Sequence, residues 1–271
     1  MLIAQITDTH IRTPGALAYG VVDTAAFLER AVAHLMTLAP RPDVVLVTGD
    51  LTDFDQPEEY ARFRALTAAV PIPLLPIPGN HDSTSGVATA FPEIAARAQA
   101  GKLNYVEEAF PVRLVMLDSS VSGASHGELG AATLAWLDAT LATAPDRPAL
   151  IALHHPPFLT GINHMDVQNL RDADALEQVV SRHAQVLAVV CGHVHRTVFT
   201  RFAGVTASIC PSTAHAVTLD FDPAGAPTFH LEPPALHLHR FADERLVTHT
   251  SFIGTYDGPH PFFGPDKALL G

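Results

Sequence analysis

The chain has 271 residues, 48% of them hydrophobic, and 28 acidic against 16 basic residues give a formal net charge of −12. This hydrophobic content supplies a sizeable core, and large α/β enzymes reach this length. The negative charge argues against a partner that is a nucleic-acid polymer, because surfaces that bind nucleic acids are basic.

Apolar runs that read as strands alternate with helical patterns along most of the chain. Asp23 is a suitable N-cap for the first helix, Pro40 lies just beyond its end, and Pro57 opens the second. The predicted strands cover 2–7, 43–49, 73–77, 112–118, 149–153, 187–191 and 205–210, and the predicted helices 23–39, 57–71, 131–143 and 172–183. Strands separated by helices favour parallel pairing in a layered α/β domain.

The sequence from residue 231 onward differs in character, because it is rich in proline, histidine and aromatic residues and only weakly periodic. We predict a catalytic domain at 1–230 and a C-terminal extension at 231–271. The extension would serve as a cap or a dimerisation arm in a homo-oligomer, since exposed aromatic side chains mark contact surfaces. The alternative is a terminal strand pair packed on the core. His230 and the histidines of this tail lack ligand spacing, which favours surface or interface positions for His230, His237, His239, His249 and His260.

Two features bear on the compartment. Cys191 and Cys210 lie in apolar strand-like runs, which indicates buried free thiols and fits a reducing environment. The chain opens directly in a strand without the regions of a signal peptide, and no apolar run approaches the ~20 residues that span a bilayer. We therefore expect a soluble, cytoplasmic protein without a membrane partner.

Five short motifs carry the chemistry, and each follows a predicted strand. They are Asp8-Thr9-His10, Gly49-Asp50, Gly79-Asn80-His81-Asp82, His154-His155 and Gly192-His193-Val194-His195. Their Asp, Asn and His side chains bind divalent metals of hard to borderline character. Two side chains that are two positions apart on an extended segment point to the same face, as expected for Asp8 with His10. Seven ligands are too many for one tetrahedral ion and suit two ions that share a carboxylate.

This set of motifs resembles the calcineurin-like metallophosphoesterases, whose pattern is D-x-H, G-D, G-N-H-[DE], a histidine and G-H-x-H. Within that superfamily the chain looks most like bacterial glycerophosphodiesterases and class III cyclic-nucleotide phosphodiesterases. The closer likeness is carried by Ile6-Thr7-Asp8-Thr9-His10, His154-His155-Pro156-Pro157, Leu117-Asp118-Ser119-Ser120 and Pro211-Ser212-Thr213-Ala214-His215. The resemblance implies a four-layer α/β/β/α sandwich of two facing sheets flanked by helices.

The resemblance also implies roles for particular residues. The first ion would be held by Asp8, His10, Asp50 and His195, and the second by Asp50, Asn80, His154 and His193. Asp50 would bridge the two ions. His81 would contact the substrate phosphate or donate a proton, Asp82 would orient His81, and His215 matches a substrate-side histidine. Oxygen and nitrogen ligands suit Fe, Mn, Zn or Co.

The ions indicate the mechanism, because a divalent metal lowers the pKa of its water and makes hydroxide available as a nucleophile. Phosphatases of this superfamily place arginines beside the G-D and G-N-H blocks to grip a dianion. Here those blocks continue as Leu51-Thr52-Asp53 and Ser83-Thr84-Ser85, without arginine, which favours a diester. We expect hydrolysis of small phosphodiesters resembling glycerophosphodiesters. The alternatives are a 3′,5′-cyclic nucleotide phosphodiesterase and a metal-binding scaffold without turnover.

Several residues near the motifs have two interpretations. Arg12 and Arg196 could touch a phosphate or form salt bridges. The acidic run Asp53, Asp55, Glu58 and Glu59 reads as a solvated start of a helix. His155 is expected behind the ligands, because neighbours on an extended segment point in opposite directions.

Overall fold

The protein folds around two β-sheets that face each other. The computed structural model describes residues 1–270. In the first sheet the strand order is β13-β12-β1-β2-β3, and in the second it is β4-β5-β6-β7-β9-β8. The first contains β1 (Leu2–Ile6), β2 (Val44–Thr48), β3 (Leu74–Ile77), β12 (Ala235–Ala242) and β13 (Arg245–Phe252). The second contains β4 (Tyr105–Glu107), β5 (Arg113–Met116), β6 (Ala149–Ala152), β7 (Val186–Cys191), β8 (Val198–Phe202) and β9 (Val205–Ile209).

The centres of both sheets are parallel. β1, β2 and β3 pair in parallel, as do β5, β6, β7 and β9, which confirms the predicted pairing. The antiparallel strands β4, β8, β12 and β13 lie toward the edges, and of these β4 and β8 were not predicted from the sequence. A separate short ladder joins β10 (Ala216–Val217) to β11 (Phe229–His230). Parallel strands end at the same edge of a sheet, and this brings the loops that follow them together.

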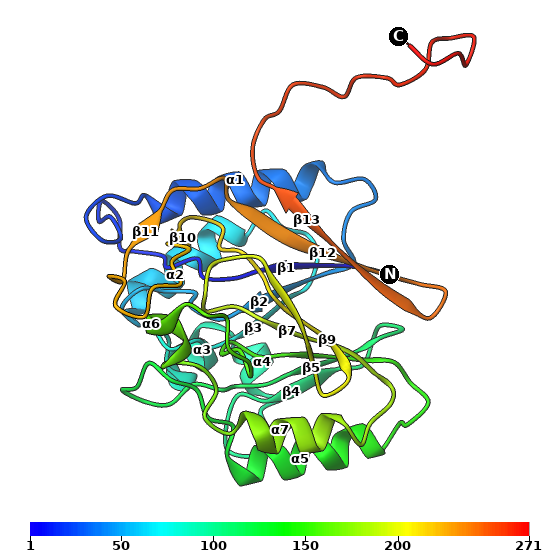
Figure 1. The fold of residues 1–271 in the computed structure, drawn as a ribbon. Coiled ribbons are helices and arrows are strands. Elements are labelled where there is room, and N and C mark those ends of the chain that lie inside the picture. The colour runs from blue at the N-terminus through cyan, green and yellow to red at the C-terminus, as the bar shows by residue number, and fades with distance from the viewer. Residues whose placement is uncertain (271) are drawn as a thin grey trace.

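Helices cover the outer faces of the two sheets, so the four-layer α/β/β/α prediction is confirmed (Figure 1). α1 (Thr24–Thr37) and α2 (Pro57–Thr67) pack beside the first sheet, and α5 (Gly130–Ala142) and α7 (Ala173–Val180) beside the second. The side chain of Asp23 caps α1 by accepting from the N–H of Ala26 at 3.1 Å, as predicted. The short helices α3 (Thr84–Ala90), α4 (Pro92–Ala95) and α6 (Asn163–Asp166) lie in connections. No helix among residues 1–270 is long and apolar enough to cross a membrane.

The apolar core has two main parts. The larger one joins α1 and α2 to the first sheet and continues between the sheets to β5, β6 and β7. The second lies between the other face of the second sheet and α5 and α7. Central strands are buried along their whole length, as in β2, where all five residues are buried. Such continuous apolar runs are typical of parallel strands covered on both faces.

The C-terminal part of the chain contributes to this body. β12 pairs with β1, with His237 opposite Gln5, so residues 235–252 form the terminal strand pair that was the alternative expectation. His237 and His239 are buried on β12, and the prediction of surface or interface positions is wrong for these two. His230, His249 and His260 are exposed. Ile253 is still buried in the core, and beyond it the chain runs away from the body as an arm, residues 254–270 (Figure 1). The predicted role of cap or dimerisation arm remains a prediction.

We predict that Leu46→Ala lowers the free energy of unfolding by about 2–5 kcal/mol, because it leaves a cavity in a fully buried strand. The matched control is Val247→Ala on β13, where the side chain is 46% exposed and the expected change is within about 0.5 kcal/mol. Chemical denaturation of both variants measures the difference. Equal losses would contradict the assignment of β2 to the core.

Candidate metal centre

Five loops converge at one edge of the two sheets, and each leaves the carboxyl end of a strand. The loops after β1, β2 and β3 come from the first sheet, and those after β6 and β7 from the second. They bring together the side chains that were predicted as metal ligands, which are all buried except the half-buried Asn80: Asp8, His10, Asp50, Asn80, His154, His193 and His195. Ligands of open α/β sheets bind at this edge.

The backbone at most of these residues is left-handed. The φ angle is 53° at Asp8, 43° at His10, 50° at Asp50, 75° at His193 and 58° at His195. The expectation that side chains two apart project from an extended segment is therefore wrong here. Asp, Asn and His are the non-glycine residues that enter this region most readily. Backbone strain of this kind persists where the surrounding structure imposes it, commonly at functional sites.

Glycines allow the loops to approach one another. A Cβ on Gly79 would overlap the carboxylate of Asp50, and a Cβ on Gly192 would overlap the hydroxyl of Thr7. Gly49 has a φ of 94°, and a Cβ there would overlap the ring of His154. The glycines of the motifs thus set how closely the ligand-bearing loops pack.

The first cluster consists of Asp8, His10, Asp50 and His195, with one ligand atom from each lying within 4.8 Å of all the others. Nε2 of His10 is 3.2 Å from Nε2 of His195 and 3.6 Å from Oδ2 of Asp50. Nε2 of His195 is 3.3 Å from Oδ1 of Asp8. The structure therefore brings together the four side chains assigned to the first ion.

The second cluster forms around Asn80. Its Oδ1 lies 3.1 Å from Nε2 of His154 and 2.9 Å from Nδ1 of His193. Oδ2 of Asp50 lies 3.4 Å from Nε2 of His154. The same oxygen of Asp50 therefore faces His10 of the first cluster and His154 of the second.

Three of the imidazoles are anchored through their outer nitrogen. In each, Nδ1 lies beside an oxygen that only accepts, so Nδ1 carries the proton and the lone pair of Nε2 points into the centre. The pairs are His10 with the Asp53 carboxylate at 3.2 Å, His154 with the Thr48 carbonyl at 2.8 Å and His195 with the His215 carbonyl at 3.2 Å. Sequence reasoning missed these anchors, because two are backbone oxygens and Asp53 lies in an acidic run without a distinctive spacing.

The electrostatics of the centre fit bound cations. Among residues 1–270, the ion pairs of the buried carboxylates Asp8 and Asp50 are all with histidines. Burial opposes the ionisation of Asp50, yet nearby imidazoles, chiefly His154, hold its pKa well below the usual range. Burial would lower the pKa of His154, but the charge of Asp50 raises it to about 9. Buried carboxylates need a compensating positive charge, and the proton on His154 supplies part of it here. Inward-facing oxygen and nitrogen donors are ligands that divalent metals accept.

His81 lies beside this centre and is partly open to solvent, with 34% of its side chain exposed. Its N–H donates to Oδ1 of Asp50 at 2.8 Å, and its Nδ1 donates to the carbonyl of Asp53 at 2.9 Å. Burial would lower the pKa of His81, but the charges of Asp50 and Asp53 and the bond to the Asp53 carbonyl raise it. The proton-carrying form of His81 is thereby favoured at the mouth of the site.

Asp82 does not make the contact to His81 that the resemblance implied. Its carboxylate accepts from the N–H groups of Leu51, Thr52 and Gly79 at 2.9–3.1 Å and from the hydroxyl of Tyr60 at 3.1 Å. The carboxylate is buried, and burial together with the charge of Asp50 raises its pKa to about 6. Asp82 therefore ties the loop after β2 to the loop after β3, and Asp53 takes the place beside His81.

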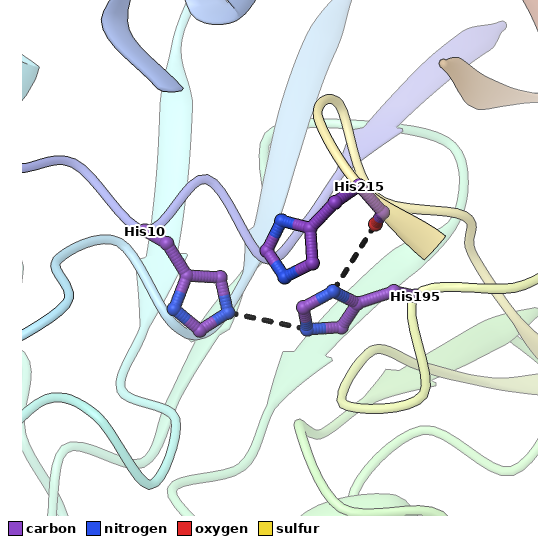
Figure 2. A group of neighbouring side chains, drawn as sticks. All are labelled: His10, His195 and His215. Atoms are coloured by element: carbon purple, nitrogen blue, oxygen red, sulfur yellow. Dashed lines mark hydrogen bonds between the residues drawn. The ribbon is translucent and has the colours of Figure 1, made fainter. Parts of the chain in front are cut away.

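His215 lies next to His10 and His195 (Figure 2). It lines a cavity of about 320 Å³ that reaches His10, His81 and Asn80 and has Tyr19 and Phe229 on its wall. The ring of His215 is 5.2 Å from each of these two aromatic rings. Burial and the neighbouring imidazoles lower the pKa of His215, so it faces the cavity as a neutral ring.

The two arginines beside the motifs form ion pairs, and part of the acidic run is buried. Arg12 forms ion pairs with Asp53 and Glu59, and Arg196 forms one with Glu232, so both take the salt-bridge alternative. The expectation of a solvated acidic run is wrong for Asp53 and Glu59, which are buried.

His155 is buried next to the ligand His154, and its Nδ1 lies 2.8 Å from the hydroxyl of Ser119. This contact with the core agrees with the expected position behind the ligands. Cys191 and Cys210 are buried free thiols, as predicted.

Comparison with known proteins gives consistent relatives. A probable glycerophosphodiester phosphodiesterase GpdQ of Arcobacter nitrofigilis is 39% identical over 272 residues, covering 100% of both chains. A 3′,5′-cyclic adenosine monophosphate phosphodiesterase CpdA of Escherichia coli K12 is 30% identical, covering 93% of this chain and 94% of that one.

Among solved structures, a dimetal phosphatase from Danio rerio superposes with a TM-score of 0.71 at 16% identity, over 94% of this chain and 96% of that one. At this identity the likeness supports the fold alone. The family described as calcineurin-like phosphoesterase matches residues 1–197, which include all five motifs. The chain therefore belongs to the calcineurin-like phosphoesterase family.

Proposed function

We propose that this protein is a dinuclear-metal phosphodiesterase that hydrolyses small diesters resembling glycerophosphodiesters. The observation that carries the proposal is the position of Asp50, whose Oδ2 faces Nε2 of His10 on one side and Nε2 of His154 on the other. A carboxylate between two clusters of inward-facing ligands suits a pair of ions that share it. The names of the relatives, which include glycerophosphodiester and cyclic AMP phosphodiesterases, agree with this activity.

In this proposal, one ion is held by Asp8, His10, Asp50 and His195, and the other by Asp50, Asn80, His154 and His193. When bound, the ions activate water as a nucleophile and act as Lewis acids toward the phosphoryl oxygens. Fe, Mn, Zn and Co all suit such oxygen and nitrogen ligands, and availability decides among them.

The chain's own residues orient the substrate and move the proton. His81, whose ring is held in place by the bond from its Nδ1 to the Asp53 carbonyl, donates a hydrogen bond to the phosphate and then a proton to the departing alkoxide. Asn80 lies at the same mouth and positions the phosphate beside His81. His215 and the aromatic wall formed by Tyr19 and Phe229 hold one ester arm. Asp82 acts through the loops that it ties together, which carry Asp50 and Asn80.

A diester is favoured over a monoester because the site holds little positive charge of its own. The lining of the 320 Å³ cavity includes no lysine or arginine, and Arg12 and Arg196 are engaged in ion pairs. A monoanionic diester needs less compensation than a dianionic monoester. A 3′,5′-cyclic nucleotide is the second candidate substrate, and a planar base would suit the aromatic wall.

A substrate panel tests the proposal. The enzyme, stripped of metal and reloaded with one defined metal at a time, is assayed with glycerophosphoethanolamine, cyclic AMP and a phosphomonoester. We expect the highest kcat/KM with glycerophosphoethanolamine. Faster hydrolysis of cyclic AMP would move the assignment to the second candidate, and no metal-dependent turnover of any diester would leave the scaffold alternative. We also propose a cytoplasmic location, which the two buried free cysteines support.

We predict that Asp50→Ala loses both ions and all measurable turnover, because Asp50 is the one carboxylate that faces both clusters. Metal analysis of the purified variant and assay of a diester measure the two effects. The matched control is Asp146→Ala, which removes an exposed carboxylate and should keep both ions and the normal rate. Two retained ions with a near-normal rate in the Asp50 variant would refute the shared-carboxylate assignment.

We predict that His81→Ala keeps both ions but loses about 10²–10⁴ in kcat/KM for substrates with poor leaving groups. The loss should be much smaller for bis(p-nitrophenyl) phosphate, because p-nitrophenolate departs without a proton. The exposed His249→Ala variant serves as the control. An equal loss with both substrates would remove the acid role, and loss of metal would make His81 a ligand.

We propose that the arm, residues 254–270, holds a homo-oligomer together. It exposes large apolar side chains, with Phe262 78% and Leu269 73% accessible. We predict that a chain ending at residue 253 becomes monomeric while the layered body stays folded, because β12, β13 and the buried Ile253 are retained. Light scattering during gel filtration measures the mass, and a full-length monomer would end the proposal.

A further inference from the structure

The side chain of Gln5 lies buried between the two sheets and joins three strands. Its Nε2 donates to the hydroxyl of Thr48 at 3.0 Å and to the carbonyl of Cys191 at 3.0 Å. Gln5 is on β1, Thr48 ends β2 and Cys191 ends β7. The loops that follow these three strands carry five of the seven predicted ligands: Asp8, His10, Asp50, His193 and His195. The buried amide of Gln5 therefore connects the three strands whose following loops carry most of the predicted ligands.

The C-terminal hairpin, formed by β12 and β13, sets the orientation of the Gln5 amide. Since Nε2 of Gln5 uses both of its protons as a donor, its Oε1 must accept. Nε2 of His239 on β12 lies 3.1 Å from that oxygen, and Nδ1 of His239 accepts from the hydroxyl of Thr248 at 2.8 Å. His239 and Gln5 are fully buried, and burial lowers the pKa of His239 to about 3, so the ring is neutral. This neutral ring is the donor that keeps the Gln5 amide from turning over.

The network continues into the centre through Thr48. The carbonyl of Thr48 accepts from Nδ1 of His154 at 2.8 Å and from the hydroxyl of Thr7 at 3.1 Å. A Cβ on Gly192 would come within 2.9 Å of that carbonyl, so the loops after β2 and β7 are tightly packed against each other at this point. A shift of Thr48 therefore moves a ligand imidazole directly, since packed interiors transmit displacement.

From these contacts we infer that Gln5 and His239 are positioning residues of the metal centre, and that the chain Thr248–His239–Gln5–Thr48–His154 fixes the spacing between its two clusters. The inference rests on the metal centre of the proposed function. It gives the C-terminal hairpin a role in the site although none of its residues lines the 320 Å³ cavity.

The test replaces His239 by leucine and titrates Mn²⁺ into the metal-free protein by calorimetry, with kcat and KM measured beside it. Replacing hydrogen-bond partners of ligands costs about 10–100-fold in metal affinity, and His239 acts from further out. We expect the affinity of the site that contains His154 to fall about 3–10-fold and kcat to fall with it, while KM for a diester changes little. His239→Gln, which can still donate to Gln5, should restore both values toward wild type.

The matched control is His237→Leu. His237 lies two residues away on the same strand, is equally buried, and neither of its ring nitrogens has a hydrogen-bond partner among residues 1–270. This variant should keep the wild-type affinity and kcat. If both variants lose affinity equally, or if His239→Leu loses thermal stability alone, the effect is one of packing and the inference is overturned.

A second variant covers the case in which His239→Leu does not fold. Gln5→Met combined with His239→Leu leaves no buried amide without a partner, so folding should recover. Thr48 and Cys191 still lack the bonds from Gln5, and the metal site that contains His154 should stay impaired. Full recovery of affinity would overturn the inference. A wild-type protein that binds fewer than two ions would instead contradict the proposed function, before any variant is compared.

Discussion

The whole centre depends on keeping two carboxylates, Asp8 and Asp50, ionised in a place that water hardly reaches. Burial opposes their charge, which is offset by neighbouring imidazoles and by the backbone N–H groups of His81 and His193. Such an arrangement is costly unless cations bind there, because uncompensated buried charge is among the most destabilising features a fold can hold. The strained backbone, the glycines and the outer hydrogen bonds all serve to keep these charges and the histidine lone pairs aimed at one place.

The two sheets bring these carboxylates and histidines together at the ends of their strands. Parallel strands of two sheets finish at a common edge, so residues that are up to 187 positions apart, from Asp8 to His195, come within contact. Left-handed turns then direct the side chains inward from both sheets. Backbone bonds from Asp8 to Gly49 and from His10 to Asp50 join the loops after β1 and β2, and buried polar side chains hold further loops in place. Asp82 holds the loops after β2 and β3 together, and Gln5 joins β1, β2 and β7 just before their loops begin.

The C-terminal hairpin belongs to the layered body of the protein and not to the exposed arm. Its strands extend the first sheet, and His239 belongs to the polar network between the sheets. The family match covers residues 1–197, yet the fold that surrounds the centre includes a segment far beyond that limit. The body therefore runs to the end of β13, and the exposed arm is the part that can vary without disturbing the core.

The sequence by itself determined the motifs, their order and the alternation of strands and helices, since these are local patterns of residue type and periodicity, and the grouping of ligands around Asp50 followed from the resemblance that the motifs carry. It did not determine the left-handed backbone at Asp8, His10 and Asp50, because conformation at a loop is imposed by neighbouring loops. It also misplaced Asp53, His237 and His239. Burial of a polar side chain depends on partners distant in the chain, such as Gln5 for His239, and only the tertiary structure brings those partners together.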